Sequence, residues 1–314
     1  MGPRGEHILV TGGAGFIGSH LAAALLESNT VTIYDSFANG NRAHIPPTAR
    51  VIEGDICDHD QLASIVADVD RIYHEAAMVS VPQSVEAPLE SHDVNLRATV
   101  ALLEAARRHN VPVVLASSAA IYGQPNTLPI TEDHRCQPSS PYGLEKLAID
   151  QYARLYHEQY GLETVSLRYF NVYGPGQSGQ YAGVISTFCD QAQRGQPLTI
   201  EGDGTQTRDF VHVSDVVQAN LLAATSPAAV GNAINIGTGQ STTIASLAET
   251  IISTVDADIG TTHIDGRAND VAHSVADISR AREMLGFEPR TDLATGLQSL
   301  VSGSEVNRRV NRPH

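Results

Sequence analysis

Short apolar runs alternate with amphipathic stretches along the first half of the chain. The runs are rich in β-branched residues, which is typical of buried strands. The strands predicted in this way are His7–Thr11, Val31–Tyr34, Val51–Glu53, Arg71–His74, Val113–Ala116 and Thr164–Leu167. Helices are predicted at Ile17–Glu27, at Gln61–Val66, between Val94 and His109, and at Pro141–Tyr160. Alternation of this kind requires crossover connections, so we expect an α/β fold: a doubly wound parallel sheet (Rossmann) covered by helices on both faces.

The alternation becomes less regular after Tyr169, where the glycine-rich segments 174–176 and 202–204 indicate loops. Further elements are predicted at Ser214–Ala224 (helix), Ala233–Ile236 (strand) and Ile244–Val255 (helix). We expect a Rossmann domain over residues 1–170, to which the chain returns around residues 206–240. Residues 171–303 should mainly form a smaller α/β substrate-binding domain, and the polar residues 304–314 a disordered tail.

Composition excludes several classes of protein. The chain has 314 residues, of which 42% are hydrophobic, and no apolar run approaches the length of about 18 residues that a membrane span needs. The first apolar run is too short for a signal peptide, so we expect a cytoplasmic protein. Cys57, Cys136 and Cys189 are far apart and the histidines show no ligand spacing, so neither disulfides nor a metal site are expected.

The charge of the chain is strongly acidic and its basic residues are almost all arginine. The formal net charge of −15 would repel nucleic-acid phosphates, and no basic stripe offsets it. Of the 20 basic residues, 19 are Arg and one is Lys. High-GC codon usage explains this bias, and so does adaptation of a possible halophile to a salty cytoplasm, where salt screens acidic charge.

A glycine-rich loop joins the first predicted strand to the first predicted helix. Gly12, Gly15 and Gly18 have the spacing of a pyrophosphate-binding turn, in which glycines allow a tight turn, close approach of the phosphate and helix–strand packing. The helix N-terminus adds free N–H groups and a positive dipole end. Asp35 ends the second strand, where a carboxylate binds the adenosine ribose and selects NAD over NADP. Asp55 and Ile56, after the third strand, are candidates for the adenine side.

A tyrosine and a lysine lie four residues apart at the start of a long predicted helix. Tyr142 and Lys146 therefore share a helix face, with Ser140 as the expected N-cap. A free tyrosine has a pKa of about 10, and a nearby ammonium together with a positive nicotinamide ring would lower it enough to make a general base. The only lysine of the chain stands here, which argues against a chance pair on a surface helix. Ser117 and Ser118 end a buried strand, where a hydroxyl could share the same substrate oxygen.

These segments together resemble the extended short-chain dehydrogenase/reductase superfamily, and within it the UDP-galactose (UDP-glucose) 4-epimerase group. The likeness covers about residues 6–300. It rests on TGGAGFIGSHL, YD, GDI, SSAAIYG, PYGLEK, LRYFNVYGPG, GDGTQTRDFVHV and a late Arg267/Asp270 pair, all in the family's order. The resemblance implies an NAD-dependent isomerase with a UDP-sugar as substrate.

The resemblance also assigns roles to single residues. It implies Ser118 as the catalytic hydroxyl beside Tyr142 and Lys146. For the cofactor it adds Phe16, Ile17, Asn39, Ala76, Asn95 and Tyr169 to the glycines, Asp35, Asp55 and Ile56, with Asn95 and Tyr169 at the nicotinamide half. For the substrate it implies Ser80, Ser118, Tyr142, Asn171, Val184, Arg208, Arg267, Asp270 and Ser274, with the two arginines clamping phosphate.

Two departures from related families refine the expected reaction. Sister dehydratases place Asp-Glu after the catalytic hydroxyl and the xylose-forming decarboxylases a Glu, whereas this chain has Ala119-Ala120. Epimerisation needs no such acid: Tyr142 removes and returns the C4 hydroxyl proton, with a transient 4-keto sugar between. Ser274 aligns with a bulky Tyr of glucose-specific enzymes, so the pocket could also accept UDP-GlcNAc and UDP-GalNAc. A lysine common in the loop after the fourth strand is replaced here by Met78-Val79-Ser80.

Two other functions stay open at the level of the sequence. A UDP-glucuronate 4-epimerase, or another enzyme for sugar nucleotides, would need a carboxylate-binding group that the sequence does not reveal. A non-catalytic NAD-sensing module would be expected to lack the Tyr or the Lys. The resemblance further suggests a homodimer through paired helices, with Ala101, Leu102, Ala105, Ala106, Leu147, Tyr152 and Leu155 as candidates for that face.

Overall fold

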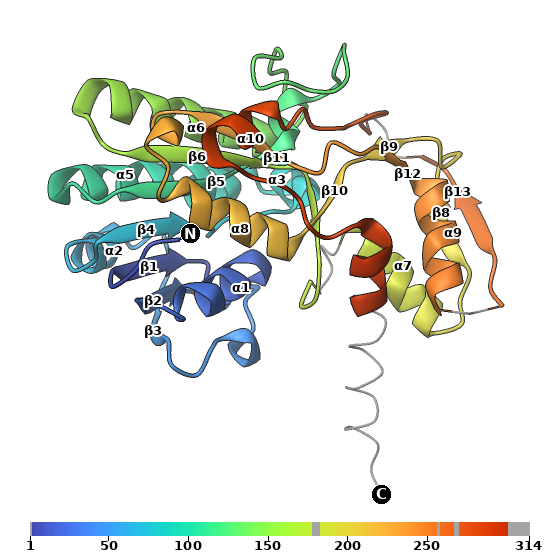
Figure 1. The fold of residues 1–314 in the computed structure, drawn as a ribbon, viewed down its shortest axis with the longest axis horizontal. Helices are drawn as coiled ribbons and strands as arrows, with labels where there is room; N and C mark the ends of the chain where they lie inside the picture. Colours follow the sequence, from blue (N-terminus) through green and yellow to red (C-terminus); the bar gives the residue numbers. More distant parts are fainter. Residues whose placement is uncertain (1, 178–182, 256–257, 267–269, 301–314) are drawn as a thin grey trace, which may run out of the picture.

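The computed structural model describes residues 2–177, 183–255, 258–266 and 270–300. Its largest element is a seven-stranded sheet in the order β11-β6-β5-β4-β1-β2-β3 (Figure 1). The strands are β1 (His7–Thr11), β2 (Thr30–Asp35), β3 (Arg50–Glu53), β4 (Arg71–His74), β5 (Val113–Ser118), β6 (Thr164–Tyr169) and β11 (Ala233–Ile236). Every neighbouring pair is parallel, which confirms the expected doubly wound fold.

The order of the strands reverses between β1 and β4. From β1 the chain continues outward through β2 to β3, and then crosses back to place β4 on the other side of β1. Thr11 and His74 are register partners at the carboxyl ends of these two strands. In open α/β sheets, ligands bind outside the carboxyl ends of the strands at such a switch point.

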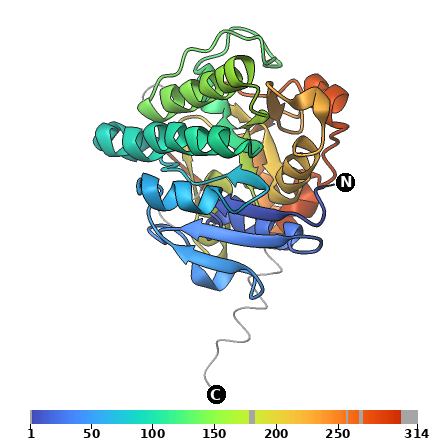
Figure 2. The ribbon, with the colours of Figure 1, turned by 90° about the vertical axis from the view of Figure 1, so that its left-hand side faces the viewer.

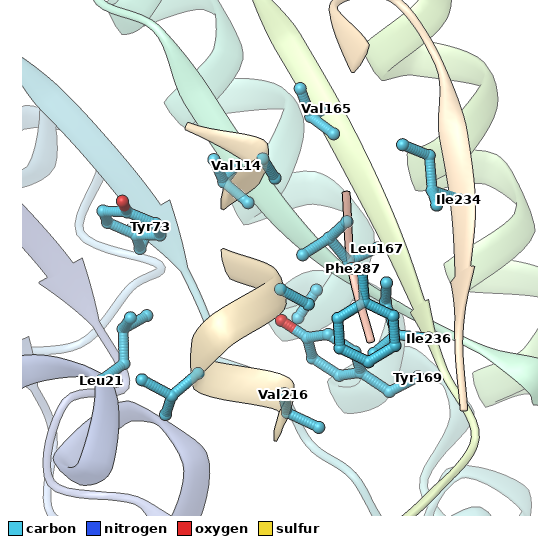
Figure 3. Close-up of a cluster of buried hydrophobic side chains, with 14 of the residues drawn as sticks. Leu21, Tyr73, Val114, Val165, Leu167, Tyr169, Val216, Ile234, Ile236 and Phe287 are labelled. Atoms are coloured by element: carbon cyan, nitrogen blue, oxygen red, sulfur yellow. The ribbon is translucent and has the colours of Figure 1, made fainter. Parts of the chain in front are cut away.

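Helices cover both faces of this sheet (Figures 1 and 2). One apolar cluster packs α1 (Phe16–Leu25), α8 (Val213–Ala223) and α10 (Ser279–Leu285) on one face. The other joins α2 (His59–Val66), α5 (Ala98–His109) and α6 (Pro141–Tyr160) to the opposite face. Figure 3 shows the first cluster, in which Tyr169 of β6 lies among aliphatic side chains of the sheet and of α8.

Several boundaries differ from those predicted. β5 and β6 each extend two residues further, to Ser118 and Tyr169, while α1 ends at Leu25. The helix expected between Val94 and His109 is preceded by α3 (Val81–Glu86) and α4 (Pro88–His92), and begins as a π-helical segment, η2 (Asp93–Arg97). Prolines in the first turns of α3 and α4 divide this region into short helices.

One part of the expected dimer face is wrong. Leu102, Ala105 and Ala106 of α5 are 0–4% exposed and pack within the protomer, against the sheet and α2. Tyr152 and Leu155 of α6 are 38% and 39% exposed. A helix of a doubly wound fold must bury one apolar stripe on its own sheet, and in α5 these residues form that stripe.

The smaller part of the molecule has its own apolar core around Phe188, Leu198 and Leu247. Its helices are α7 (Val184–Gln193) and α9 (Ile244–Val255), and its strands are β7 (Asn171–Tyr173), β8 (Leu198–Glu201), β9 (Thr207–Arg208), β10 (Phe210–His212), β12 (Thr242–Thr243) and β13 (Thr261–Ile264). They form three two-stranded sheets, β10-β7, β12-β9 and β13-β8. Short 3₁₀ segments occur at η1 (Arg42–His44), η3 (Ala119–Tyr122) and η4 (Pro227–Ala229).

The chain passes between the two parts more than once. β11 belongs to the large sheet and α8 packs on it, although both follow β7 to β10 in sequence. Within the described ranges, no helix is long and apolar enough to cross a membrane. The tail predicted at residues 304–314 lies outside the described residues.

Candidate active site

The glycine loop after β1 is closely packed against the segment that follows β4. Gly12 has a φ of +70°, and a Cβ there would lie 2.6 Å from the amide nitrogen of Ala76. A Cβ on Gly18 would lie 2.3 Å from the carbonyl oxygen of Gly12. Only glycine allows both the turn and this contact, so the loop has the features that a dinucleotide requires.

The first turn of α1 has free N–H groups for an anion. Its N-cap, Gly15, makes no side-chain cap, and the turn carries no acidic side chain. Phe16 and Ile17 begin the helix. Such an N-terminus attracts phosphate through its N–H groups and its dipole, so this end of α1 fits the pyrophosphate of NAD.

Asp35 ends β2 and connects two loops. Its carboxylate accepts hydrogen bonds from the N–H groups of Ala14, at 2.9 Å, and Phe37, at 2.8 Å. The carboxylate is thereby fixed beside the glycine loop, where it fits the ribose role predicted for it. Asn39 lies exposed in the loop that follows β2.

The turn after β3 carries Asp55 and Ile56, which were predicted to lie at the adenine side. The backbone oxygen of Asp55 accepts from the hydroxyl of Tyr34 at 2.6 Å, and its carboxylate accepts from the N–H of Cys57 at 2.9 Å. Asp55 is exposed and Ile56 is buried. The turn is therefore fixed by β2 as well as by its own side chain.

Ser118, Tyr142 and Lys146 meet at the carboxyl ends of β5 and β6. Ser118 is the last residue of β5, and its hydroxyl interacts with the phenol of Tyr142 closely enough to lower the pKa of that phenol. Lys146 donates to the carbonyl oxygen of Ala116 at 2.8 Å, and its Nζ lies 5.8 Å from the centroid of the Tyr142 ring. Ser140 caps the helix by accepting from the N–H of Gly143. The structure thus places together the three residues that were predicted to be catalytic.

The protein's own groups raise the pKa of Tyr142. Burial raises the pKa of Tyr142 to about 12; the Ser118 hydrogen bond lowers it, and the charges of Glu75 and Glu145 raise it further. Among the protein's own groups, desolvation of the phenolate therefore dominates. The lowering expected from the ammonium together with a positive nicotinamide stays a prediction. Burial likewise lowers the pKa of Lys146 to about 8, against the opposing effect of Glu75, Asp150 and Glu145.

Asn95 is buried behind α6 and does not lie at an open surface. Its carbonyl accepts from the N–H of Met78 at 2.8 Å, and its amide donates to the Met78 carbonyl and to Glu145, the latter at 2.8 Å. Ser91 donates to the same carboxylate oxygen at 2.7 Å. These contacts hold the loop after β4 against α6, and the role predicted for Asn95 at the nicotinamide stays a prediction.

Four of the residues predicted to bind substrate lie in β9 or near it. Arg208 donates to the carboxylate of Asp270 at 2.7 Å and to the carbonyl of Val271. The N–H of Ser274 donates to Thr207 at 3.1 Å, and that of Asn171 to Asp209 at 3.0 Å. Arg208 and Asp270 thus form an ion pair, a contact the sequence did not reveal.

The remaining predicted residues have other surroundings. Ser80 is buried and its hydroxyl accepts from the N–H of Gln83 as the N-cap of α3. Val184 is half-buried at the start of α7, and Ala76 is half-buried beside Gly12. Arg267 lies outside the described residues.

Sequence reasoning missed two titratable residues at the end of β4. His74 is bound on both sides, by Thr11 at 2.7 Å and by Thr99 at 2.8 Å. Glu75 accepts from the hydroxyl of Tyr169 at 2.8 Å. The sequence does show a charged residue directly after a buried strand. It does not show that β4 lies beside β1, so the position of Glu75 next to the glycine loop could not be predicted. In the part of the chain that the structure describes, no group of three or more acidic, His or Cys side chains could hold a metal ion.

Comparison with known proteins agrees with this geometry. The UDP-glucose 4-epimerase of Corynebacterium glutamicum is 38% identical over 304 residues, covering 92% of this chain and 92% of that protein. A UDP-N-acetylglucosamine 4-epimerase from Methanobrevibacter ruminantium, solved with UDP-N-acetylmuramic acid, aligns with a TM-score of 0.93 at 37% identity, over 97% of this chain and all of that one.

A second similar structure contains NAD. The Thermus thermophilus UDP-glucose 4-epimerase in complex with NAD aligns with a TM-score of 0.88 at 33% identity, covering 94% of this chain and 98% of that one. The model of the NAD dependent epimerase/dehydratase family matches residues 8–237. The chain therefore belongs to the NAD dependent epimerase/dehydratase family.

Proposed function

We propose that this protein is an NAD-dependent isomerase that inverts C4 of a UDP-hexose. The observation that carries the proposal is the convergence of Ser118, Tyr142 and Lys146 next to a glycine loop built for a dinucleotide. The UDP-sugar epimerases among its relatives cover nearly the whole chain. The expected cytoplasmic location stays a prediction.

NAD, when bound, supplies the hydride chemistry, and the protein supplies orientation and proton transfer. Tyr142 takes the proton of the C4 hydroxyl while C4 is oxidised, and returns it when the 4-keto sugar is reduced from its other face. Because burial raises the pKa of Tyr142 to about 12, the positive charge of an oxidised nicotinamide is needed to favour the phenolate. Ser118 donates to the same oxygen and Lys146 balances the charge.

The segment after Ser118 supports epimerisation over dehydration. Ala119 and Ala120 open η3, and the hydroxyl of Ser118 accepts from the N–H of Ala120 at 3.2 Å. No carboxylate stands at these two positions to protonate a leaving hydroxyl. The side chains there cannot assist the loss of water or of carbon dioxide.

We propose that the substrate range includes 2-acetamido sugars. Ser274 is a small side chain held beside β9 by the hydrogen bond to Thr207. The similar enzyme from Methanobrevibacter ruminantium is a UDP-N-acetylglucosamine 4-epimerase. Both UDP-galactose and UDP-GalNAc are therefore expected to react.

The test is to incubate purified protein with UDP-galactose, UDP-GalNAc or UDP-glucuronate, without added NAD, and to assay the C4 epimers. Tyr142→Phe should lower turnover by about 10²–10⁴-fold and leave NAD bound, because only the general base is removed. Tyr152→Phe, an exposed tyrosine of the same helix, is the control. Near-normal turnover in Tyr142→Phe would contradict the assignment, and turnover of UDP-glucuronate alone would identify the runner-up function.

We also propose that the protein is a homodimer. Leu144, Tyr152 and Leu155 lie on one side of α6, and Leu144 is 59% exposed. Leu89 of the neighbouring α4 is 82% exposed. An apolar strip along a helix of an otherwise acidic surface supports self-association through this face.

A further inference from the structure

Glu75 is the first residue after β4 and lies at the switch point of the sheet. Its N–H donates to the carbonyl of Thr11 at 3.1 Å, which fixes its backbone to the end of β1. A Cβ on Gly12 would approach the carbonyl carbon of Glu75 to 2.9 Å. Glu75 is therefore in direct contact with the glycine loop, at the edge where the catalytic groups meet.

The side chain of Glu75 ends a directed series of hydrogen bonds. Asn220 of α8, which is fully buried, donates to the hydroxyl oxygen of Tyr169 at 2.8 Å. Tyr169 has a single hydroxyl proton and donates it to the carboxylate of Glu75 at 2.8 Å. Because β5 and β6 pair Ser118 with Tyr169, this series lies beside the catalytic hydroxyl.

The charged groups around Glu75 belong to the catalytic helix. Lys146 and Tyr142 of α6 both interact electrostatically with its carboxylate. Tyr169 is its contact from β6, and the Asn220 amide of α8 is neutral. The neighbouring His74 is bound by Thr11 and Thr99, and burial lowers its pKa to about 3, so it carries no charge at neutral pH.

We propose that Glu75 is a positioning residue whose negative charge sets the ionisation of the Tyr142–Lys146 pair, with Tyr169 and Asn220 holding its carboxylate in place. The proposal rests on the function proposed above and adds a residue to it. The carboxylate keeps Lys146 protonated and opposes the loss of the phenol proton. The phenolate then forms mainly when a positive nicotinamide offsets this charge.

The charge of Glu75 itself depends on pH. Burial raises the pKa of Glu75 to about 7, while the hydrogen bond from Tyr169 and the charge of Lys146 lower it. The carboxyl is therefore charged above neutral pH and neutral below it. Glu75, Tyr142 and Lys146 interact and titrate together, so each observed midpoint is a property of the three groups and not of one residue.

The experiment compares Glu75→Gln with Glu75→Asp in the NAD-saturated enzyme. Glu75→Gln keeps the shape and an acceptor for Tyr169 but removes the charge, whereas Glu75→Asp keeps the charge on a shorter side chain. The tyrosinate absorbance is titrated in each variant, and the signal of Tyr142 is obtained by subtracting a partner that also carries Tyr142→Phe. The pH dependence of kcat is the second measurement.

We expect Glu75→Gln to move the Tyr142 midpoint, and the acid limb of kcat, down by about one pH unit, with the curves converging below about pH 7. Glu75→Asp should stay close to the parent enzyme. An unchanged midpoint in Glu75→Gln would overturn the proposal. A larger shift in Glu75→Asp than in Glu75→Gln would do the same, because it would show that the hydrogen bond matters and the charge does not.

A second variant keeps the test decisive if Glu75→Gln does not fold. Tyr169→Phe removes the hydrogen bond that favours the carboxylate, so Glu75 should stay protonated to higher pH and the Tyr142 midpoint should fall. An unchanged midpoint there counts against the proposal. These titrations need no substrate, so the failure of the epimerase function would be seen separately, as an absent C4 epimer.

Discussion

Single residues at the glycine loop combine two separate constraints, backbone conformation and close packing. Gly12 and Gly161 have the same φ of +70°, but a Cβ on Gly161 would meet nothing within 4 Å. Gly161 is the C-cap of α6, far along the chain from the loop. The pair therefore separates the cost of a left-handed conformation from the cost of a clash.

Gly161→Ala should lower the free energy of unfolding by about 1–2 kcal/mol, the cost of a left-handed conformation, and leave NAD bound. Gly12→Ala should cost more and lose NAD, since its Cβ would lie 2.6 Å from the Ala76 nitrogen. Denaturant unfolding and the NAD content after purification measure the two effects. Equal losses of unfolding free energy and of NAD in the two variants would mean that the backbone at Ala76 moves aside at little cost.

At the scale of elements, His74 joins three of them. Its two ring nitrogens bind Thr11 of β1 and Thr99 of α5, while the residue itself ends β4. Burial, followed by the charge of Lys146, lowers the pKa of His74 from 6.5 to about 3. A base with a depressed folded-state pKa stabilises the fold above its unfolded pKa, and this stability is lost as the pH falls toward the folded pKa.

The free energy of unfolding should therefore fall between about pH 6.5 and pH 3 by about 1.4 kcal/mol per pH unit on account of His74. His74→Gln should be less stable than the parent at pH 8, and the gap should close as the pH decreases. Urea unfolding at a series of pH values measures the gap. His109→Gln, an exposed position at the end of α5, is the control. A stability difference between the parent and His74→Gln that is constant with pH would show that His74 does not cause the pH dependence of stability.

The helices and strands show which features of the fold the sequence pattern can predict. Periodicity and the glycine motif predict the parallel sheet, the long helix α6 and the Tyr142–Lys146 pair, because these depend on local spacing. The final residues of β5 and β6 are polar or charged, so the pattern ends before Ser118 and Tyr169. The hydrogen bond from Tyr169 to Glu75 crosses 94 residues and depends on strand order, which no local pattern contains.

For the whole molecule, the exposed strip on α6 predicts the oligomeric state. Leu155→Glu would place two carboxylates opposite each other across a symmetric interface, so the variant should sediment as a monomer where the parent is a dimer. Ile264→Glu, at a position of β13 that is 50% exposed, adds the same charge elsewhere and should leave the dimer intact. A parent protein that sediments as a monomer, or a Leu155→Glu variant that remains a dimer, would contradict this face.

Because β11 and α8 return to the large part of the molecule, dividing the chain at a single position cannot separate the two parts. A fragment that stops at residue 170 would leave the edge of β6 without the strand that pairs with it, and would remove the α8 side chains that fill one core. Exchanging the smaller part with that of a relative would therefore require at least four joints, two around the segment from β7 to β10 and two around the segment from β12 to β13. Because the two parts alternate along the sequence, single substitutions at the residues proposed to bind substrate near β9 are a simpler route to a change of specificity than an exchange of modules.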